Sequence, residues 1–161
     1  MRLWHKELID VLPNKQLISQ WRELCAIASC IVKNKTPNHV LVNKIMNYPI
    51  EHFERYSELV QKEMKNRGFK ISDRVKNTFE SNCRICRKYM TGDSIINILF
   101  DKFDELYRNW HNNRYLIQCY YNLQEKYDCG GMTEQEWRRI RNKVVGDKEI
   151  RDADIYLTLH S

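Results

Sequence analysis

The sequence of 161 residues has little glycine or proline and no long apolar segment. Five glycines and three prolines leave little room for long structureless loops. No apolar run approaches the roughly 20 residues that a membrane-spanning helix needs. The opening stretch, residues 1–7, has one arginine but no apolar region of the kind found in a secretory signal. These absences predict a soluble, intracellular protein of the cytoplasm or nucleoid, or of the nucleus if its source is eukaryotic or viral.

The six cysteines do not form the pattern of a metal site or of a disulfide framework. Cys83 and Cys86 have the C-x-x-C spacing of half a zinc site. Cys119 and Cys129 stand ten positions apart and supply no second half. In an intracellular chain such residues are more often small buried side chains. We therefore expect no metal and no cofactor.

Helical periodicity dominates the first half of the chain. Apolar residues recur at helical spacing from Leu17 to Ile31, which predicts a long first helix with Asn14 as its N-cap. A second helix is predicted from Pro49, as its first residue, to Gly68, just past its end. The stretches 34–47 and 70–92 are expected to be connectors. The first-helix stripe consists of Leu17, Trp21, Leu24, Ala28 and Ile31.

Three more helices are predicted in the second half. The third follows Gly92 and runs to Trp110, and the fourth spans Leu116 to Tyr127. A capping box, Thr133-x-x-Glu136, predicts the start of the fifth. The predicted fold class is all-α: one compact domain of about five helices over residues 1–146, with an N-terminal arm lodged against the bundle. Residues 147–161 are expected to form a C-terminal tail, and the protein is expected to be a monomer.

Two features point to a polyanionic partner and a groove. Lysine and arginine number 27 against 21 aspartates and glutamates, which gives a net charge of +6 and a pI near 9.0. This excess favours nucleic acid, although ordinary cytosolic proteins also show it. Opposite its apolar stripe, the first helix carries small and polar residues with Arg22 at their margin, which indicates either a groove wall or a plain surface face. These residues are Gln16, Ser19, Glu23, Ala26 and Cys30.

The run Trp21-Arg22-Glu23-Leu24 on the predicted first helix is an aromatic-Arg-Glu-Leu motif. It is similar to a signature on the first long helix of the pyrimidine-dimer DNA glycosylases of the phage endonuclease V type. The stretch 65–73, with Arg67-Gly68-Phe69 in it, looks like the exit of the family's second helix. The opening Met1-Arg2-Leu3-Trp4-His5 resembles a bacterial and viral branch of the family. The resemblance covers about residues 1–75.

The resemblance implies a DNA repair glycosylase and AP lyase that acts on double-stranded DNA through its N-terminal amine. An α-amino group has a pKa of about 7.7–8.0, against about 10.4 for lysine, and therefore supplies unprotonated amine more readily. In this sequence the implied catalytic residues are Met1, whose amine attacks the sugar, and Glu23, which stabilises the cation. The implied DNA-binding residues are Arg2, Arg22 and Gln16; the last stands where the family has a histidine.

Two other interpretations remain open at this point. A non-catalytic nucleic-acid-binding helical domain would keep the basic surface and tolerate an extended N-terminus. A protein-interaction or structural helical domain would need neither. The aromatic residues around Trp4, Trp21 and Tyr120 are more often core than platforms for base stacking.

Overall fold

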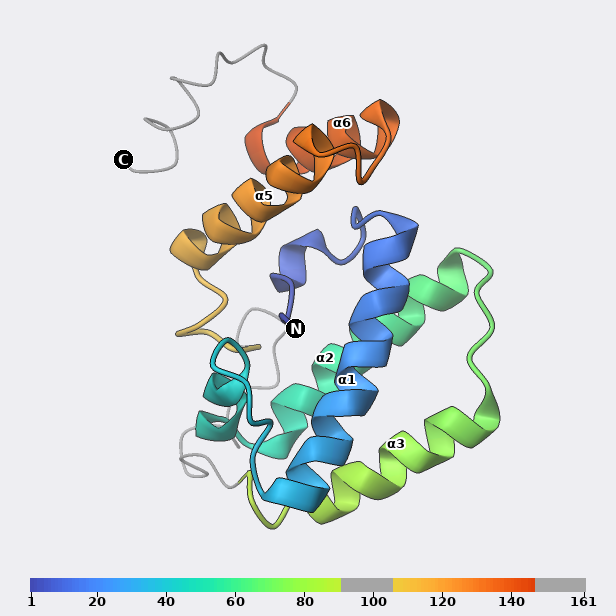
Figure 1. Ribbon diagram of the computed structural model, residues 1–161, viewed down its shortest axis with the longest axis vertical. Helices are drawn as coiled ribbons and strands as arrows, with labels where there is room; N and C mark the ends of the chain where they lie inside the picture. Colours follow the sequence, from blue (N-terminus) through green and yellow to red (C-terminus); the bar gives the residue numbers. More distant parts are fainter. Residues whose placement is uncertain (91–105, 147–161) are drawn as a thin grey trace.

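The computed structural model describes residues 1–90 and 106–146, and every regular element in those ranges is helical (Figure 1). Helix α1 packs against α2 and α3, and α5 packs against α6. The all-α prediction is confirmed. None of the described helices is long and apolar enough to cross a membrane. The elements are η1 (Lys6–Leu8), α1 (Asn14–Asn34), η2 (Asn43–Asn47), α2 (Ile50–Asn66), α3 (Asp73–Cys86), α5 (Asn113–Asp128) and α6 (Glu134–Val145), where η denotes a 3-10 helix.

One continuous core joins these elements into a single domain. It extends from Leu3, before η1, to Ile140 on α6. All five members of the apolar stripe predicted for α1 are buried. At the start of α6, Thr133 and Glu136 form the predicted capping box, in which each side chain accepts a hydrogen bond from the other residue's backbone N–H.

The helix ends differ in detail from the predicted ones. Asn14 is the first residue of α1 and not its N-cap, because the cap position falls on Pro13, whose backbone is extended. Pro49 is likewise the cap of α2, and the helix begins at Ile50. Gly68 lies where predicted, with φ +78°. The amides of Gly68 and Phe69 bond to the carbonyls of Lys65 and Met64, at 2.9 Å each, which closes the helix in a Schellman motif.

The predicted connector 70–92 was wrong, because it contains α3. This helix buries a narrow stripe of only three side chains, Phe79, Cys83 and Cys86. Phe79 lies between α1 and α2, with ring centroids 5.0 Å from Trp21 and 5.6 Å from Phe53. Because the stripe has only three members and two of them are cysteines, the sequence showed little hydrophobic periodicity in this region. The predicted connector 34–47 contains only the short η2.

The third predicted helix falls largely on residues 91–105, outside the described residues. Its last part, residues 106–110, forms a turn and not a helix. Tyr107 has φ +53°, a left-handed conformation that an α-helix cannot contain. Its carbonyl accepts hydrogen bonds from the amides of Trp110 and His111, both at 2.7 Å. The fourth helix is confirmed as α5, and the predicted tail, 147–161, lies outside the described residues.

Candidate functional site

The N-terminal segment Arg2–Leu12, here called the arm, lies between α1 and the α5–α6 pair (Figure 1). Backbone hydrogen bonds of η1 and the next turn satisfy part of the arm's backbone, but residues 2–4 precede η1 and pair with no strand in the described part of the chain, so side chains satisfy their backbone. The amide of Arg2 donates to Oε2 of Glu23 at 2.9 Å, and the amide of Trp4 donates to Oε1 of Gln20 at 2.8 Å. The arm therefore runs antiparallel to α1, with residue 2 level with residue 23.

Other elements hold the opposite side of the arm. The Tyr115 hydroxyl on α5 donates to the carbonyl of Leu3 at 2.5 Å, and the Tyr56 hydroxyl on α2 donates to that of Trp4 at 2.6 Å. The amide of Lys6 donates to Nδ1 of His111 at 3.0 Å. Each contact satisfies a polar group that burial has removed from water, so the position of the arm is fixed from three directions.

Arg67, in the motif at the exit of α2, holds the far end of the arm. Its guanidinium donates to the carbonyls of Leu12 at 2.5 Å and Asp10 at 2.8 Å, and Glu63 orients it through an ion pair of 2.7 Å. A planar guanidinium with five donors suits several acceptors at once, which a lysine could not reproduce. The resemblance to the family's helix exit thus coincides with a residue that positions the arm.

The arm brings the α-amino nitrogen of Met1 close to Glu23. Successive backbone nitrogens are at most about 3.7 Å apart, given standard bond lengths. Because the Arg2 nitrogen is 2.9 Å from the Glu23 carboxylate, the Met1 nitrogen is no more than about 7 Å from it. Met1 is 39% exposed, and Glu23 is half-buried. An exposed first residue therefore lies beside a half-buried carboxylate, within about 7 Å of it.

The expected DNA-binding residues occupy different environments. Arg22 is exposed on α1, next to Glu23. The Arg2 guanidinium lies over the Trp4 ring, 5.7 Å from its centroid, and its charge partly offsets the rise that burial causes in the pKa of the Cys119 thiol on α5. Gln16 is half-buried, and its Oε1 has no hydrogen-bond partner among the described residues. The structure therefore brings Met1 and Arg2 to Glu23, whereas Arg22 is exposed at the neighbouring position of α1.

Two buried histidines stack on each other, His5 within the arm and His111 just before α5. His5 and His111 stack with ring centroids 5.1 Å apart. Burial lowers the pKa of His5 to about 4 and that of His111 to about 2, with the neighbouring charge of Lys6 acting in the same direction. Both rings are therefore neutral at pH 7, and Nδ1 of each accepts a backbone N–H of the arm, from Glu7 and Lys6 respectively.

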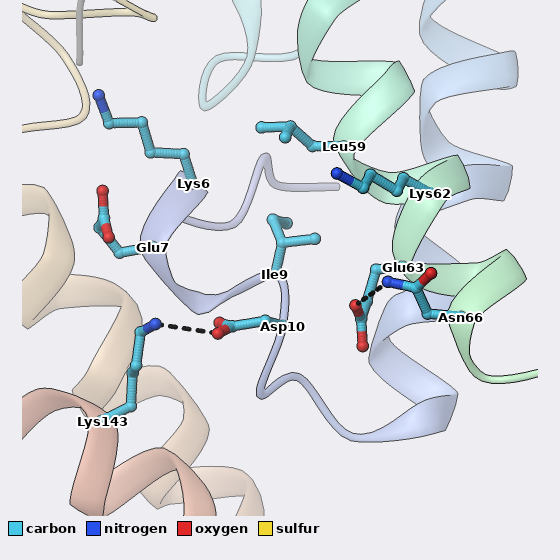
Figure 2. Close-up of a pocket in the computed structure, with 9 residues that line it drawn as sticks. All are labelled: Lys6, Glu7, Ile9, Asp10, Leu59, Lys62, Glu63, Asn66 and Lys143. Carbon is cyan, nitrogen blue, oxygen red and sulfur yellow. Dashed lines mark hydrogen bonds and ion pairs between the residues drawn. The ribbon is translucent and has the colours of Figure 1, made fainter. Parts of the chain in front are cut away.

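A hollow of about 330 Å³ lies beside the far end of the arm, between η1, α2 and α6 (Figure 2). Lys143 on α6 pairs with Asp10 across its edge at 2.9 Å. None of the residues that line the hollow is Met1, Arg2, Arg22 or Glu23. Its charges cancel, so it favours no ligand charge. The basic lining residues are Lys6, Lys62 and Lys143, and the acidic ones are Glu7, Asp10 and Glu63.

The cysteine pair that has half-site spacing is packed in the core. Cys83 and Cys86 are buried on α3, and the Cys86 thiol donates to the carbonyl of Ala28 on α1 at 3.5 Å. Burial raises the pKa of Cys86 to about 11 and that of Cys83 further, so neither forms a thiolate at neutral pH. Among the described residues no group of three potential metal ligands is present.

Sequence reasoning missed most of the residues that hold the arm. One signal was available in Gln20, which falls within the apolar stripe of α1 and is fully buried. A polar residue inside an apolar stripe indicates a buried hydrogen bond. Tyr56 and Tyr115 gave no such signal, because a tyrosine at a core position is ordinary.

The fold and site thus define an all-helical protein whose first residues are held against a glutamate. Residues 1–77 match the family model of pyrimidine dimer DNA glycosylase, which confirms the resemblance over the arm, α1, α2 and the first turn of α3. This match supports a DNA repair glycosylase in the broad sense. No curated protein and no solved structure matched the chain.

Proposed function

We propose that this protein is a glycosylase and AP lyase that acts on damaged double-stranded DNA, either at pyrimidine dimers or at abasic sites. The single observation that carries the proposal is the 2.9 Å hydrogen bond from the Arg2 amide to Glu23, which puts the chain's first nitrogen beside a carboxylate. The match of residues 1–77 to the glycosylase family and the net charge of +6 agree with it.

The proposed chemistry needs an amine and a carboxylate and no cofactor. The Met1 amine attacks C1′ and gives up a proton. At a damaged base the glycosidic bond breaks and the base leaves with that proton, whereas at an abasic site the C1′ oxygen leaves as water. The sugar ring opens to an imine, whose positive charge the Glu23 carboxylate stabilises. Loss of a proton from C2′ then expels the 3′ phosphate by β-elimination. Water hydrolyses the imine and regenerates the amine.

The decisive experiment traps the imine. The full chain is incubated with a duplex that contains one abasic site, and separately with an ultraviolet-irradiated duplex, in the presence of borohydride. A covalent adduct is expected, and peptide mass spectrometry should locate it on the first residue, which also shows whether Met1 is retained. Absence of an adduct with both duplexes, or an adduct on a lysine side chain, contradicts the proposal.

Substitution of Glu23 separates catalysis from binding. Glu23→Gln keeps an acceptor for the Arg2 amide but removes the charge, so strand cleavage should fall by about 10² or more. DNA affinity should hold or rise because repulsion from phosphate is relieved. Glu58→Gln, on an exposed part of α2, is the matched control and should cleave normally. Equal rates for both variants would favour a DNA-binding domain without catalysis.

Arg22 tests the DNA contact alone. Arg22→Ala should weaken duplex binding by roughly 1–3 kcal/mol if its guanidinium contacts a phosphate. It should also reduce the slope of log affinity against log salt by about 1. DNA binding that is indifferent to salt between about 50 and 200 mM contradicts this assignment.

A blocked amine tests the first step directly. Acetylation of the Met1 amine, or a short N-terminal extension, should abolish cleavage while circular dichroism and thermal unfolding stay unchanged. A tagged protein that cleaves abasic DNA at the normal rate removes the N-terminal amine from the mechanism.

A further inference from the structure

The loop that follows α1 combines an apolar tip with a basic flank. Val40 is 86% exposed and Leu41 49%, the two most exposed large apolar side chains in the described part of the chain. Singly exposed apolar residues are normal on protein surfaces. Here two neighbours are exposed together, whereas the next residue, Val42, is fully buried. Val40 and Leu41, here called the tip, therefore project into solvent, while the buried Val42 holds the end of the loop in the core.

Local contacts fix the shape of this loop, residues 35–42. Lys35 and Asn38 have positive φ, 64° and 54°, which turns the chain back after α1. The amide of His39 donates to Oδ1 of Asn43 at 2.9 Å, and the amide of Val42 donates to the carbonyl of His39 at 2.9 Å. A tip shaped before it binds loses less conformational entropy on contact with a partner.

The charge of this region is of one sign. Residues 24–50 contain no aspartate and no glutamate. They contain three lysines, Lys33, Lys35 and Lys44, and all three are exposed. Duplex DNA has apolar stacked bases between two rows of negatively charged phosphates. An apolar tip between exposed lysines is complementary to such a partner, because the tip can contact bases while the lysines contact phosphates.

The chain that continues beyond the loop joins an aromatic cluster that includes His111, whose Nδ1 accepts from the arm. Tyr48, just after η2, stacks on Trp110 at 6.3 Å, and Trp110 contacts His111 at 5.2 Å. His111 stacks on His5 of the arm, and Lys44 lies near enough to contribute to the lowered pKa of His111. In Figure 1 the chain after α1 turns back from the end of that helix toward the level of the N-terminus. A surface that contacts the start of the arm can therefore extend to the loop.

We propose that Val40 and Leu41 form an apolar wedge that enters the base stack of duplex DNA, while the flanking lysines contact phosphates. This inference rests on the proposed function. A glycosylase must take its target nucleotide out of the stack, and unstacking costs free energy that an inserted aliphatic side chain offsets. The wedge accordingly supplies the opening of the duplex, and the amine beside Glu23 supplies the chemistry.

The test compares two double variants. V40S/L41S removes the wedge, and V75S/I85S changes two side chains on α3 that are 42% and 41% exposed. With duplex DNA that carries one abasic site, V40S/L41S should cleave about tenfold or more slowly, and V75S/I85S should match the wild type. On a single-stranded abasic oligonucleotide, where nothing needs unstacking, all three proteins should form the borohydride adduct equally.

Fluorescence of 2-aminopurine in an uncut duplex measures the opening without catalysis. Wild-type protein should raise the fluorescence, V40S/L41S should not, and V40S/L41F should restore it because phenylalanine also wedges between bases. Equal cleavage and equal fluorescence for wild type and V40S/L41S overturn the wedge while leaving the proposed function intact. Loss of the adduct on every substrate overturns the proposed function, and the fluorescence still decides whether the wedge exists.

An aliphatic tip among lysines also resembles a surface that meets anionic lipid. Sedimentation with vesicles of anionic phospholipid separates the two partners. No binding is expected. Binding that V40S/L41S abolishes, together with unchanged 2-aminopurine fluorescence, overturns the wedge in favour of a lipid surface.

Discussion

Two segments outside the α-helices flank α1, and they are held in opposite ways. The arm, before α1, is bound along its backbone by side chains from α1, α2, α5 and the 107–111 turn. The 35–42 loop, after α1, closes on itself through contacts no more than seven residues apart, such as those of Asn43 with Thr36 and His39. The arm has its backbone bonded within the protein and leaves Met1, which precedes it, exposed to solvent, whereas the loop exposes the side chains of Val40 and Leu41.

This difference agrees with the functions proposed for the two segments. A nucleophile must be held within a fraction of an ångström, so a segment that positions one needs long-range contacts on several sides. A wedge needs only a rigid tip, and local turns provide that. Changes to the arm should therefore affect the stability of the whole domain, and changes to the loop should not.

The largest expected effect is that of acid on the arm. Unfolding restores the ordinary histidine pKa near 6.5, so between pH 6.5 and pH 4 the unfolded chain binds more protons than the folded one. The free energy of unfolding should fall over that window by about 3 kcal/mol from His5 alone, and His111 adds to the loss. Urea unfolding at pH 7, 6, 5 and 4 measures the loss.

His111→Asn is the matched control for the acid effect. Asparagine places an acceptor near the position of Nδ1 for the Lys6 amide but carries no titratable proton. The variant should therefore lose less stability than the wild type on acidification. Parallel pH profiles for the two proteins would show that carboxylates, and not these histidines, set the acid sensitivity.

Arg67→Ala should have the next largest effect. It leaves the carbonyls of Asp10 and Leu12 without their donor and Glu63 without its partner. We expect a loss of roughly 3 kcal/mol, because hydrogen bonds from charged groups contribute about 1.5–3 kcal/mol each and water replaces part of that. Chemical denaturation measures the loss, and amide exchange at Trp4 should speed up.

Arg67→Lys sharpens this test, because lysine keeps the positive charge but lacks the planar guanidinium whose several N–H groups donate at once. It should recover less than half of the lost stability. Full recovery would mean that charge alone holds the end of the arm.

A smaller effect is expected from Tyr56→Phe. The substitution removes the hydroxyl that donates to the buried Trp4 carbonyl and keeps the ring in the core. Leaving that acceptor unsatisfied should cost about 1–2 kcal/mol in thermal or urea unfolding. Tyr121→Phe on α5, where the ring is 40% exposed, is the control and should change little. Similar values for both variants would argue that the hydroxyl of Tyr56 does not position the arm.

The smallest effect should come from the loop. Asn43→Ala removes the acceptor for the exposed His39 amide, which water can then replace. We expect a change of about 0.5 kcal/mol or less in the free energy of unfolding. A loss as large as that of Arg67→Ala would contradict the view that the loop is held locally.

The sequence by itself determined most of the helices. The stripe of α1, the capping box of Thr133 and Glu136 and the closing Gly68 of α2 depend on residues a few positions apart. Periodicity and capping depend on residues within that range, so they can be recognised from the sequence alone. The periodicity did not predict α3, because its stripe of Phe79, Cys83 and Cys86 was too short and too rich in cysteine to indicate a helix.

Only the tertiary structure decided where the arm lies. Glu23 was marked by the family resemblance, yet nothing local connects it to the Arg2 amide 21 residues earlier. The partners of Leu3 and Lys6 are 112 and 105 residues away. A buried backbone must find hydrogen-bond partners, but which side chains supply them depends on how the helices pack. The sequence therefore pointed to candidate residues through a family resemblance, and the packing of four separate elements placed the first residues beside Glu23.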